Sequence, residues 1–435
     1  MSNGRYRAYP EYKDSGLPWM TQVPVHWTEA RFKHVLADKK KVLRPDLPAG
    51  SISFGRVVYK DAEVFSEDTK ASYQEVLAGE FLVNPLNLNY DLLSLRTALS
   101  SIDVVVSTGY IVLQGTGRLH PNYARWLLQQ FDVAHMKTLG AGVRQTINYA
   151  DIGNSYFFEP PLPEQIQIAK FLDHETAKID RLIEKQEELI RLLKEKRQAV
   201  ISHAVTKGLN PHVPLKDSGI PWLGQIPAHW TVASLKFYAQ VIDCKHITAE
   251  FLDDGFPLAS IGEVKGWYVN LDTAKRTTKK FYTALIEGGR KPGPGDIIFT
   301  RNATVGEAAI VPRTHLEFAM GQDVCLIRVA DVLSPEYTLH VLKSGLISKQ
   351  LDLAMIGSTF KRINVDDIRN FVFAIPPIEE QASLASEMNR ISKKYDRLIS
   401  EAENSATLLQ ERRTALISAA VTGKIDVRHW QPPAA

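Results

Sequence analysis

The sequence contains little of what marks several classes of protein. Its 435 residues include two cysteines, Cys244 and Cys325, which excludes a disulfide framework or a cysteine-rich metal site and suits a reducing cytoplasm. No run approaches the ~18 uninterrupted apolar residues of a membrane-spanning helix, and the first residues lack the apolar core of a secretory signal. Neither sign of charge dominates, since the net charge is +3. This balance permits nucleic-acid binding without indicating it, because DNA-binding proteins concentrate charge locally.

What is present is an internal repeat, and its first element is a short tryptophan-bearing motif. Residues 13–28 read KDSGLPWMTQVPVHWT, and residues 216–231 read KDSGIPWLGQIPAHWT, with eleven of sixteen positions identical. The prolines exclude regular helix and central strand, and tryptophan can bury a large area. We predict an extended brace that docks onto the end of a long helix through its tryptophans, which are Trp19, Trp27, Trp222 and Trp230.

The second repeated element is a long charged segment behind a proline pair. It reads PPLPEQIQIAKFLDHETAKIDRLI from Pro160 and PPIEEQASLASEMNRISKKYDRLI from Pro376. We call the difference in number between these two prolines the repeat offset. Prolines before an acidic first turn are typical of a helix start, and no proline or glycine interrupts residues 164–206. The sequence therefore predicts long helices over residues 160–208 and 376–424, each roughly 60 Å in length.

Apolar residues in both long segments follow a near-heptad spacing, which favours pairing of two helices. We expect the two segments to form an antiparallel coiled coil, related by an approximate twofold axis. The alternative is that each helix packs only on its own domain. The predicted pairing residues are Leu172, Ile179, Leu182, Leu189, Leu193, Val200, Met388, Tyr395, Leu398, Leu409 and Leu416.

The regions between the repeated elements differ in sequence and read as mixed modules. Strand-like runs such as SIDVVVSTGYIVLQ, from Ser101, precede helix-like runs such as PNYARWLLQQF, from Pro121. We predict an α+β chain with two globular domains, 1–159 and 209–375, each including its brace. The long helices separate them, and residues 425–435 form a C-terminal tail. Fewer residues separate the two braces than separate the two proline pairs, so the second body is longer than the first.

The duplicated brace, the PPxxEQ entrance, the DRLI helix and its AVIS end resemble the DNA-specificity subunit of type I restriction-modification systems. The resemblance covers nearly the whole chain. It implies a non-catalytic, cytoplasmic subunit in which each body is a target recognition domain reading one part of a bipartite site on double-stranded DNA. It also implies that the helices set the spacer and bind two modification subunits, which restriction subunits join. S-adenosylmethionine, ATP and Mg²⁺ would then be cofactors of those partners, with none in this chain.

Candidate DNA contacts are basic side chains for phosphates and forked or amide side chains for bases. They cluster in the stretches DKKKVLR, NPLNLNYDLLSLR, RTTKKFY and TRNATVGE, and in two glycine-bearing stretches that precede Ile147 and Ile363, which are related by the repeat offset. In the first half they are Lys39, Lys40, Lys41, Arg44, Asn87, Asn89, Tyr90, Arg96, Arg144 and Gln145. In the second half they are Arg276, Lys279, Lys280, Arg301, Asn302, Thr359, Lys361 and Arg362.

Two other classes of function stay open at this point. One is an enzyme with a hidden methyltransferase or nuclease site, and the other is a coiled-coil adaptor without DNA preference. The stretch NPLN at Asn84 lacks the second proline and the aromatic residue of amino-methyltransferases, so we interpret it as a turn. Asp254, Glu263 and Lys265 only loosely match the spacing of metal-dependent nucleases, and the histidines show no metal-ligand spacing.

Overall fold

The computed structural model describes residues 6–53, 55–60, 70–86, 95–139, 146–314, 317–355 and 362–432. The chain divides into two compact units, of which unit 1 comprises residues 1–187 and 403–435 and unit 2 comprises residues 188–402. Each unit contains one globular head and one segment of each long helix. The predicted domain plan instead assigned the helices to separate regions. Within the described residues, no helix is both long and apolar enough to cross a membrane.

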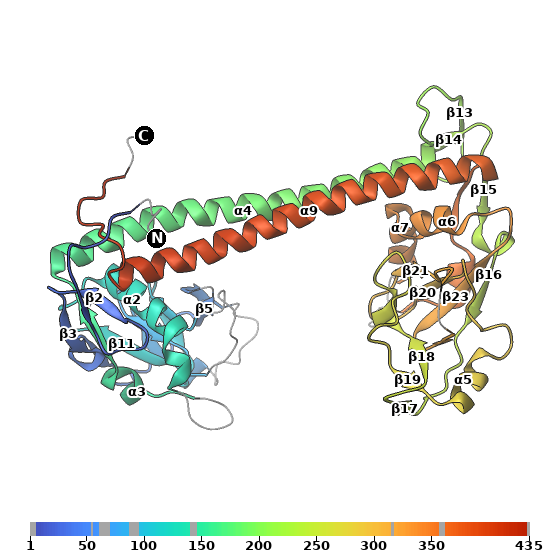
Figure 1. Ribbon diagram of the computed structural model, residues 1–435. Helices are drawn as coiled ribbons and strands as arrows, with labels where there is room; N and C mark the ends of the chain where they lie inside the picture. Colours follow the sequence, from blue (N-terminus) through green and yellow to red (C-terminus); the bar gives the residue numbers. More distant parts are fainter. Residues whose placement is uncertain are drawn as a thin grey trace. The chain divides into compact units, whose positions relative to one another are not determined.

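The head of unit 1 is built around a six-stranded mixed sheet with strand order β4-β11-β8-β9-β6-β5. Helix α2, labelled in Figure 1, belongs to this head. It contacts strand β9 of the sheet. The strands are β1 (Tyr12–Asp14), β2 (Gln22–Pro24), β3 (Thr28–Arg31), β4 (Leu36–Asp38), β5 (Gly50–Ser53), β6 (Arg56–Tyr59), β7 (Gln74–Val76), β8 (Phe81–Val83), β9 (Thr97–Leu99), β10 (Val104–Val106), β11 (Ile111–Gly115) and β12 (Tyr156–Glu159). The short helices are η1 (Phe32–His34), α2 (Pro121–Ala134), η3 (Met136–Thr138) and α3 (Tyr149–Asn154).

The head of unit 2 contains two four-stranded sheets, with strand orders β16-β23-β20-β21 and β17-β19-β18-β22. The strands are β13 (Leu215–Asp217), β14 (Gln225–Pro227), β15 (Thr231–Ser234), β16 (Ala239–Asp243), β17 (Phe251–Leu252), β18 (Phe256–Ala259), β19 (Arg276–Thr277), β20 (Ile297–Thr300), β21 (Ala308–Ile310), β22 (Ala319–Met320), β23 (Val324–Val329) and β24 (Val372–Ile375). The short helices are η4 (Leu235–Phe237), η5 (Ile261–Val264), α5 (Lys279–Ile286), α6 (Pro335–Leu342), α7 (Gly345–Ala354) and α8 (Val365–Arg369).

The two heads share one framework, and the strand registers show where they diverge. Phe81 of β8 pairs with Leu113 of β11, and Ile297 of β20 pairs with Ile327 of β23 in the same way. On the other edge of β11 and β23, Leu113 pairs with Asp38 and Ile327 pairs with Val241. Asp38 and Val241 are separated by the same number of residues as the two braces. Phe81 and Ile297, which come later in each body, are separated by the larger repeat offset. The additional length of the second body therefore lies between β16 and β20.

The second tryptophan of each brace docks onto the first turn of a long helix, as predicted, whereas the ring of Trp19 packs on Phe131 of α2. In unit 1 the indole Nε1 of Trp27 donates to Glu164 Oε1 at 2.9 Å, and His26 Nε2 lies 2.8 Å from Glu164 Oε2. Tyr9 adds a third contact, donating from its hydroxyl to Glu164 at 2.6 Å. Burial and the Glu164 carboxylate raise the pKa of the Tyr9 hydroxyl, so it remains a donor. The Glu164 side chain is only 5% exposed.

Unit 2 repeats this clip with fewer contacts. His229 Nε2 lies 2.8 Å from Glu380 Oε2, and Trp230 Nε1 donates to the same oxygen at 3.0 Å. Both clip tryptophans are fully buried, but the Glu380 side chain is 33% exposed. The glutamine that follows this glutamate also makes equivalent contacts in the two units. Gln165 and Gln381 each donate to the carbonyl of the first proline of their own entrance and accept a backbone N–H.

The brace also meets the far end of the other long helix within its unit. Gly423 ends the last long helix in the left-handed region at φ 74°, and a side chain there would meet Pro24 Cδ at 2.4 Å. Gly208 ends the first long helix at φ 72°, with Trp230 3.3 Å from the corresponding position. Glycine is required at both points because the chain is left-handed there and, at Gly423, because the brace packs too closely for a side chain.

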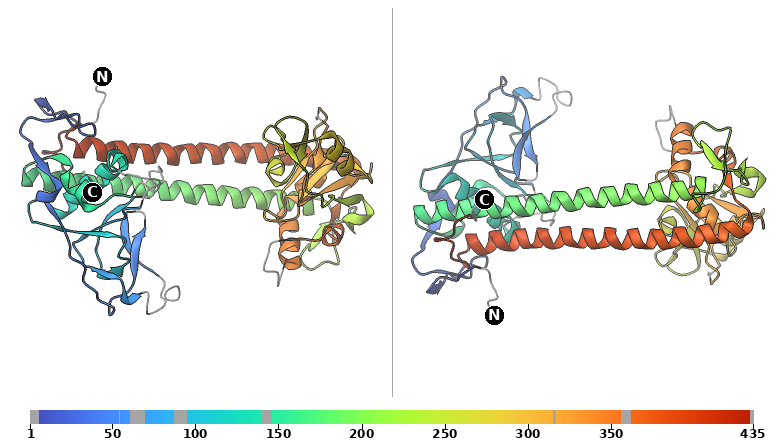
Figure 2. Two further views of the ribbon diagram at one scale, coloured as in Figure 1. Left: turned by 90° about the horizontal axis from the view of Figure 1, so that it is seen from below. Right: turned by 90° about the horizontal axis from the view of Figure 1, so that it is seen from above.

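The long helices are α4 (Leu162–Lys207), with 46 residues, and α9 (Ile378–Val421), with 44. Both fall within the predicted ranges. In unit 1 the first part of α4 lies beside the last part of α9, and in unit 2 the last part of α4 lies beside the first part of α9 (Figures 1 and 2). Ile168 and Leu172 share a core with Ile417 and Ala420. The segments are therefore paired antiparallel within each unit, as expected.

One ion pair between the helices occurs in both units. Arg413 Nε lies 2.7 Å from Asp180 Oδ1 in unit 1, and Arg197 pairs with Asp396 in unit 2. The two aspartates are related by the repeat offset, and so are the two arginines. Each long helix thus contributes the aspartate to one bridge and the arginine to the other, which places the same antiparallel register in both units.

The predicted helix seam was wrong at three positions. Leu182, Leu189 and Leu398 are exposed by 47%, 43% and 37%. Their neighbours Ile183 and Ile190 are half-buried, and Ile399 is buried. At each site two adjacent residues are apolar, so heptad spacing alone did not decide which one faces inward. Of the other predicted pairing residues, Leu172, Ile179 and Met388 are buried, and Leu193, Val200, Tyr395, Leu409 and Leu416 are half-buried.

The C-terminal tail packs on unit 1 beside the N-terminal segment. The Asp426 backbone N–H donates to the Arg7 carbonyl at 2.7 Å, and Tyr12 donates to the Lys424 carbonyl. Val427 is fully buried in the core of this unit, and the Trp430 ring lies 5.2 Å from that of Phe171. In unit 2 the chain runs directly from the end of α4 into the brace. In unit 1 the equivalent places, the end of α9 and the start of the brace, belong to opposite ends of the sequence and are joined by these contacts.

Candidate nucleic-acid interface

The loop that follows β8 in unit 1 and the loop that follows β20 in unit 2 occupy equivalent positions. The Ile147 N–H donates to the Pro85 carbonyl at 3.3 Å, and the Ile363 N–H donates to the Arg301 carbonyl at 3.0 Å. Both the donors and the acceptors of these bonds are related by the repeat offset. Each head therefore brings the same two segments together, namely the loop after its central strand and the end of its glycine-bearing stretch.

Arg301 does not project into a groove, contrary to the prediction from its place after a strand. It is 4% exposed, and its guanidinium pairs with Asp243 at the end of β16. Its Nε donates to the Ile363 carbonyl at 3.4 Å, and its backbone N–H donates to the Asp323 carbonyl at 2.8 Å. A buried guanidinium requires such partners. We correct its assignment from a DNA contact to a residue that joins three segments of the head.

Asn302 and Arg362 lie side by side on the outside of this junction. They form an isolated antiparallel bridge. Asn302 is half-buried, with its Nδ2 donating to Asp323 Oδ1 at 3.2 Å and its Oδ1 accepting from the Ala303 N–H at 2.9 Å. Arg362 is exposed and forms no ion pair with a described residue. These two predicted candidates are thus brought together by the fold.

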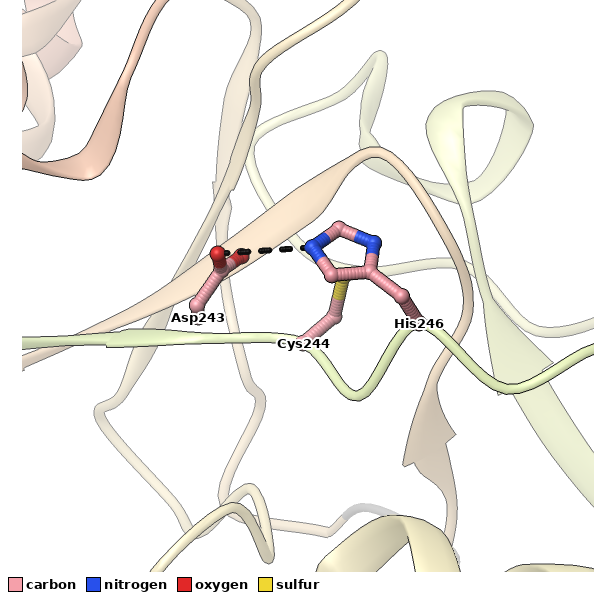
Figure 3. A group of neighbouring side chains, drawn as sticks. All are labelled: Asp243, Cys244 and His246. Atoms are coloured by element: carbon pink, nitrogen blue, oxygen red, sulfur yellow. Dashed lines mark ion pairs between the residues drawn. The ribbon is translucent and has the colours of Figure 1, made fainter.

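Three side chains that could bind a metal lie close together at the end of β16 (Figure 3). Asp243, Cys244 and His246 bring one ligand atom each within 4.8 Å of one another. The Asp243 carboxylate already pairs with Arg301, and His246 lies 3.5 Å from its other oxygen. Burial and Asp243 raise the pKa of the Cys244 thiol, whereas a cysteine ligand must be deprotonated. The cluster is better explained as the anchor of Arg301, and neither Asp243 nor Asp323 was predicted as its partner.

Two predicted phosphate or base contacts in unit 1 are also internal. Lys39 Nζ lies 3.0 Å from Glu75 and 2.8 Å from Glu80, with its side chain 8% exposed. Arg96 is 7% exposed and donates to Asp132 Oδ1 at 2.7 Å. Both cations neutralise buried carboxylates, so the structure argues against a DNA contact by either. A sequence pattern of charge could not separate these residues from their exposed neighbours.

The remaining described candidates lie on the surface of the heads. Lys40 and Lys41 are exposed beyond the end of β4, and Arg44 is exposed but held by Asp46 at 2.7 Å. Lys279 and Lys280 are exposed in the first turn of α5, and Arg276 is half-buried in β19. Seven further candidates lie outside the described residues. They are Asn87, Asn89, Tyr90, Arg144, Gln145, Thr359 and Lys361.

The described residues that loosely match catalytic motifs have local structural roles. Asn84 Oδ1 accepts the Leu86 N–H at 3.0 Å, which is a turn contact, as interpreted. Glu263 caps η5, accepting the Ser260 N–H, and Asp254 accepts the neighbouring Gly255 N–H. These carboxylates therefore hold turns together.

Comparison with known proteins gives the same answer as the repeat. The type I restriction modification DNA specificity domain matches residues 227–407. The MjaVIII specificity subunit of Methanocaldococcus jannaschii, a type I restriction enzyme subunit, is 21% identical over 96% of this chain and 98% of its own. Residues 227–407 therefore match that specificity domain, and the chain as a whole is similar to type I restriction enzyme specificity subunits. The resemblance predicted from the repeated motifs is thereby confirmed.

Other relatives agree with this assignment. The EcoBI specificity subunit of Escherichia coli is 24% identical over 62% of this chain and 58% of its own. A chain from a solved structure on complex assembly and conformational transition of the type I R-M system matches 92% of this chain and 98% of its own length. The TM-score is 0.67 at 15% identity, which supports the fold. The printed descriptions of the matched domain and of both relatives agree with the predicted DNA-specificity function, and none of them favours the enzyme or adaptor alternatives.

Proposed function

We propose that this chain is a DNA-specificity subunit, and that it reads a bipartite DNA site with the loops that follow β8 and β20. The observation that carries the proposal is the repeated backbone pairing of Pro85 with Ile147 and of Arg301 with Ile363. It builds the same platform in both heads. The residues placed on that platform differ, with Asn84, Pro85 and Leu86 in the first head and Thr300, Arg301 and Asn302 in the second. A common platform with unlike residues suits two heads that read different bases.

Exposed cations in each head are suited to phosphate contacts. Lys40 and Lys41 lie in the first head, and Lys279 and Lys280 lie in the second. Lys279 and Lys280 are the first two residues of α5 and lie at the positive end of its dipole. The lysine charges and the dipole have the same sign there, so together they favour an anion such as a phosphate. Base contacts would then set the sequence, and these lysines would set affinity and its salt dependence.

The long helices supply surfaces for the modification subunits under this proposal. In unit 1 Leu182 and Leu408 are 47% and 64% exposed, and in unit 2 Leu398 and Leu192 are 37% and 47% exposed. Leu182 corresponds to Leu398 and Leu192 to Leu408 at the repeat offset. A single exposed leucine is common on a protein surface. Exposed leucines at equivalent positions of the two repeats suit a partner that binds in two copies.

We further propose that α4 and α9 set the spacer between the half-sites. Each helix is continuous through parts of both units. The length of α4 corresponds to roughly 70 Å of rise, which exceeds one ~34 Å turn of duplex. S-adenosylmethionine, ATP and Mg²⁺ would be used by the modification and restriction subunits of a cytoplasmic complex, with no cofactor in this chain.

The test is mapping of methylated adenines in DNA from cells that carry the complete complex. We expect one split sequence with a fixed spacer. A gel-shift comparison of that sequence with random duplex, in moderate salt, supplies the binding measurement, because non-specific binding weakens steeply with salt. Methylation without a shared sequence, or equal binding to random duplex, contradicts the proposal.

A further inference from the structure

Arg301 joins three segments of the second head into one junction. Its side chain reaches Asp243 at the end of β16 and the carbonyl of Ile363. Its backbone N–H reaches Asp323, and its carbonyl accepts from Ile363. Because Arg301 is 4% exposed, these contacts are internal. The residue fixes the loop after β20 against the end of the glycine-bearing stretch.

The junction presents Asn302 and Arg362 as a pair. Residues directly opposite in an antiparallel bridge point to the same face, with Cβ atoms ~4.5–5.5 Å apart. This Cβ–Cβ distance is comparable with the ~3.4 Å rise between stacked base pairs. The two side chains could therefore contact neighbouring base pairs. In the major groove, asparagine pairs with adenine N6 and N7, and arginine pairs with guanine O6 and N7.

The hydrogen bonds of Asn302 leave its amide competent for this role. Its Nδ2 uses one hydrogen on Asp323, and its Oδ1 accepts one hydrogen from the Ala303 N–H. An amide has two donor hydrogens and two acceptor lone pairs. One of each therefore remains, which is what bidentate contact with adenine requires. The same two bonds fix the amide orientation before DNA arrives.

The backbone around the pair is held in an unfavourable conformation. Ala303 has φ 57° and Asp323 has φ 67°, both in the left-handed region that disfavours side chains. Such residues persist where surrounding contacts over-determine the conformation, and they concentrate at functional sites. Here they adjoin Asn302 from two sides of the junction.

We propose that Asn302 and Arg362 read two adjacent purines, an adenine and a guanine, and that Arg301 and Asp243 are positioning residues for this pair. The proposal rests on the proposed function of the chain as a DNA reader. The first head has Pro85 where the second has Arg301, so this reader is specific to the second half-site.

The experiment uses the complete complex with the modification subunits and maps methylated adenines for variants of this chain. Arg362→Gln should reduce the preference for guanine at one position roughly tenfold to hundredfold, and Asn302→Ala should do so for adenine at the neighbouring position. The other half-site should not change. Arg313→Gln, which alters another exposed arginine of the same head, is the matched control.

Arg301→Lys and Asp243→Asn test the positioning role. Both should relax the two positions together, while the rest of the site keeps its preference. If either variant prevents methylation, selection of bound sequences from a random duplex pool replaces that measurement. Assembly of each variant with the modification subunit is checked by size-exclusion chromatography.

The outcomes separate this inference from the proposed function. A parent complex that shows no defined site contradicts the proposed function. A parent with a split site, whose Arg362→Gln and Asn302→Ala variants keep every preference, overturns only the adjacent-purine inference. Relaxation at positions that are not neighbours, or in both half-sites, overturns it as well. Loss of preference in the Arg301 variant at unrelated positions contradicts the positioning role.

Discussion

At the residue scale, the repeat places similar side chains in environments that differ in burial. Glu164 accepts hydrogen bonds from Tyr9 and Trp27 and contacts His26, with a side chain 5% exposed. Glu380 contacts only His229 and Trp230 among the residues of its clip and is 33% exposed. The same motif therefore contributes different amounts of stability to its two units.

Glu164→Ala is expected to lower the stability of unit 1 by roughly 3 kcal/mol, because two buried donors lose their acceptor at ~1–3 kcal/mol each. Glu380→Ala should cost about 1 kcal/mol, since solvent can reach its partners. Denaturant titration followed by hydrogen-exchange mass spectrometry reports the units separately. Equal losses in the two units would show that the tyrosine contact and the deeper burial contribute nothing.

His340 in α6 makes unit 2 sensitive to acid. The ring is 1% exposed and its Nε2 lies 3.0 Å from Asn389 Oδ1. Burial lowers the pKa of His340 to about 4 from its usual 6.5. The unfolded chain therefore binds a proton first as the pH falls. Stability from the neutral ring is complete above pH ~6.5 and is lost as the pH falls toward ~4.

We expect His340→Gln to remove up to about 3 kcal/mol of stability loss between pH ~6.5 and ~4. Glutamine can still donate to Asn389 but does not titrate. The measurement is the free energy of unfolding of unit 2 against pH, for the wild-type chain and the variant. Carboxylates contribute equally to both curves and cancel in the difference. Parallel curves would mean that His340 can be protonated in the folded state.

At the element scale, the two long helices have distinct inward and outward rows. Leu193 and Leu409 are half-buried, whereas the preceding residues Leu192 and Leu408 are 47% and 64% exposed. The repeated ion pair of Asp180 with Arg413 and of Asp396 with Arg197 fixes the register of the inward row. As partly exposed pairs, these bridges add little stability, so the apolar row must supply most of it.

Leu193→Asp and Leu409→Asp should destabilise the chain by roughly 2–4 kcal/mol, because each places a charge against a partly buried apolar row. The matched controls are Leu192→Asp and Leu408→Asp, which should leave the melting temperature nearly unchanged. Thermal unfolding provides the comparison. Equal destabilisation by neighbouring substitutions would show that the inward row is assigned incorrectly.

The same control variants test the outward row as a docking surface. Leu192→Asp and Leu408→Asp are expected to weaken binding of the modification subunit at least tenfold while the chain remains folded. Co-purification and titration calorimetry with that subunit measure the effect. Unaltered binding would remove the duplicated leucines from the interface.

At the scale of the whole molecule, the chain is two versions of one framework joined by continuous helices. The similarity to the MjaVIII specificity subunit extends over 96% of this chain and 98% of that protein, so it includes both repeated halves of this chain. The proposed spacer function belongs to this scale, because it depends on helix length and on no single contact.

Inserting one heptad after Glu187 in α4 and another after Ala402 in α9 should lengthen the preferred spacer by about three base pairs. A whole heptad preserves the phase of the apolar row, and both ion pairs stay within their units. Mapping of methylated adenines reads the result, with both half-sites expected to persist. A single insertion in α4 is the control and should disrupt helix pairing. An unaltered spacer after the double insertion would exclude the helices as its determinant.

The sequence by itself determined the repeat, the two long helices and the docking of Trp27 and Trp230. These features follow from local patterns, since proline, glycine and heptad spacing act within a few residues. Only the tertiary structure decided that Arg301 and Lys39 are internal, and which of two adjacent leucines and isoleucines faces the partner helix. Burial of a charge depends on carboxylates such as Asp243 and Glu80, which lie far away in sequence. A one-dimensional pattern contains no information on which distant residue will neutralise a given cation.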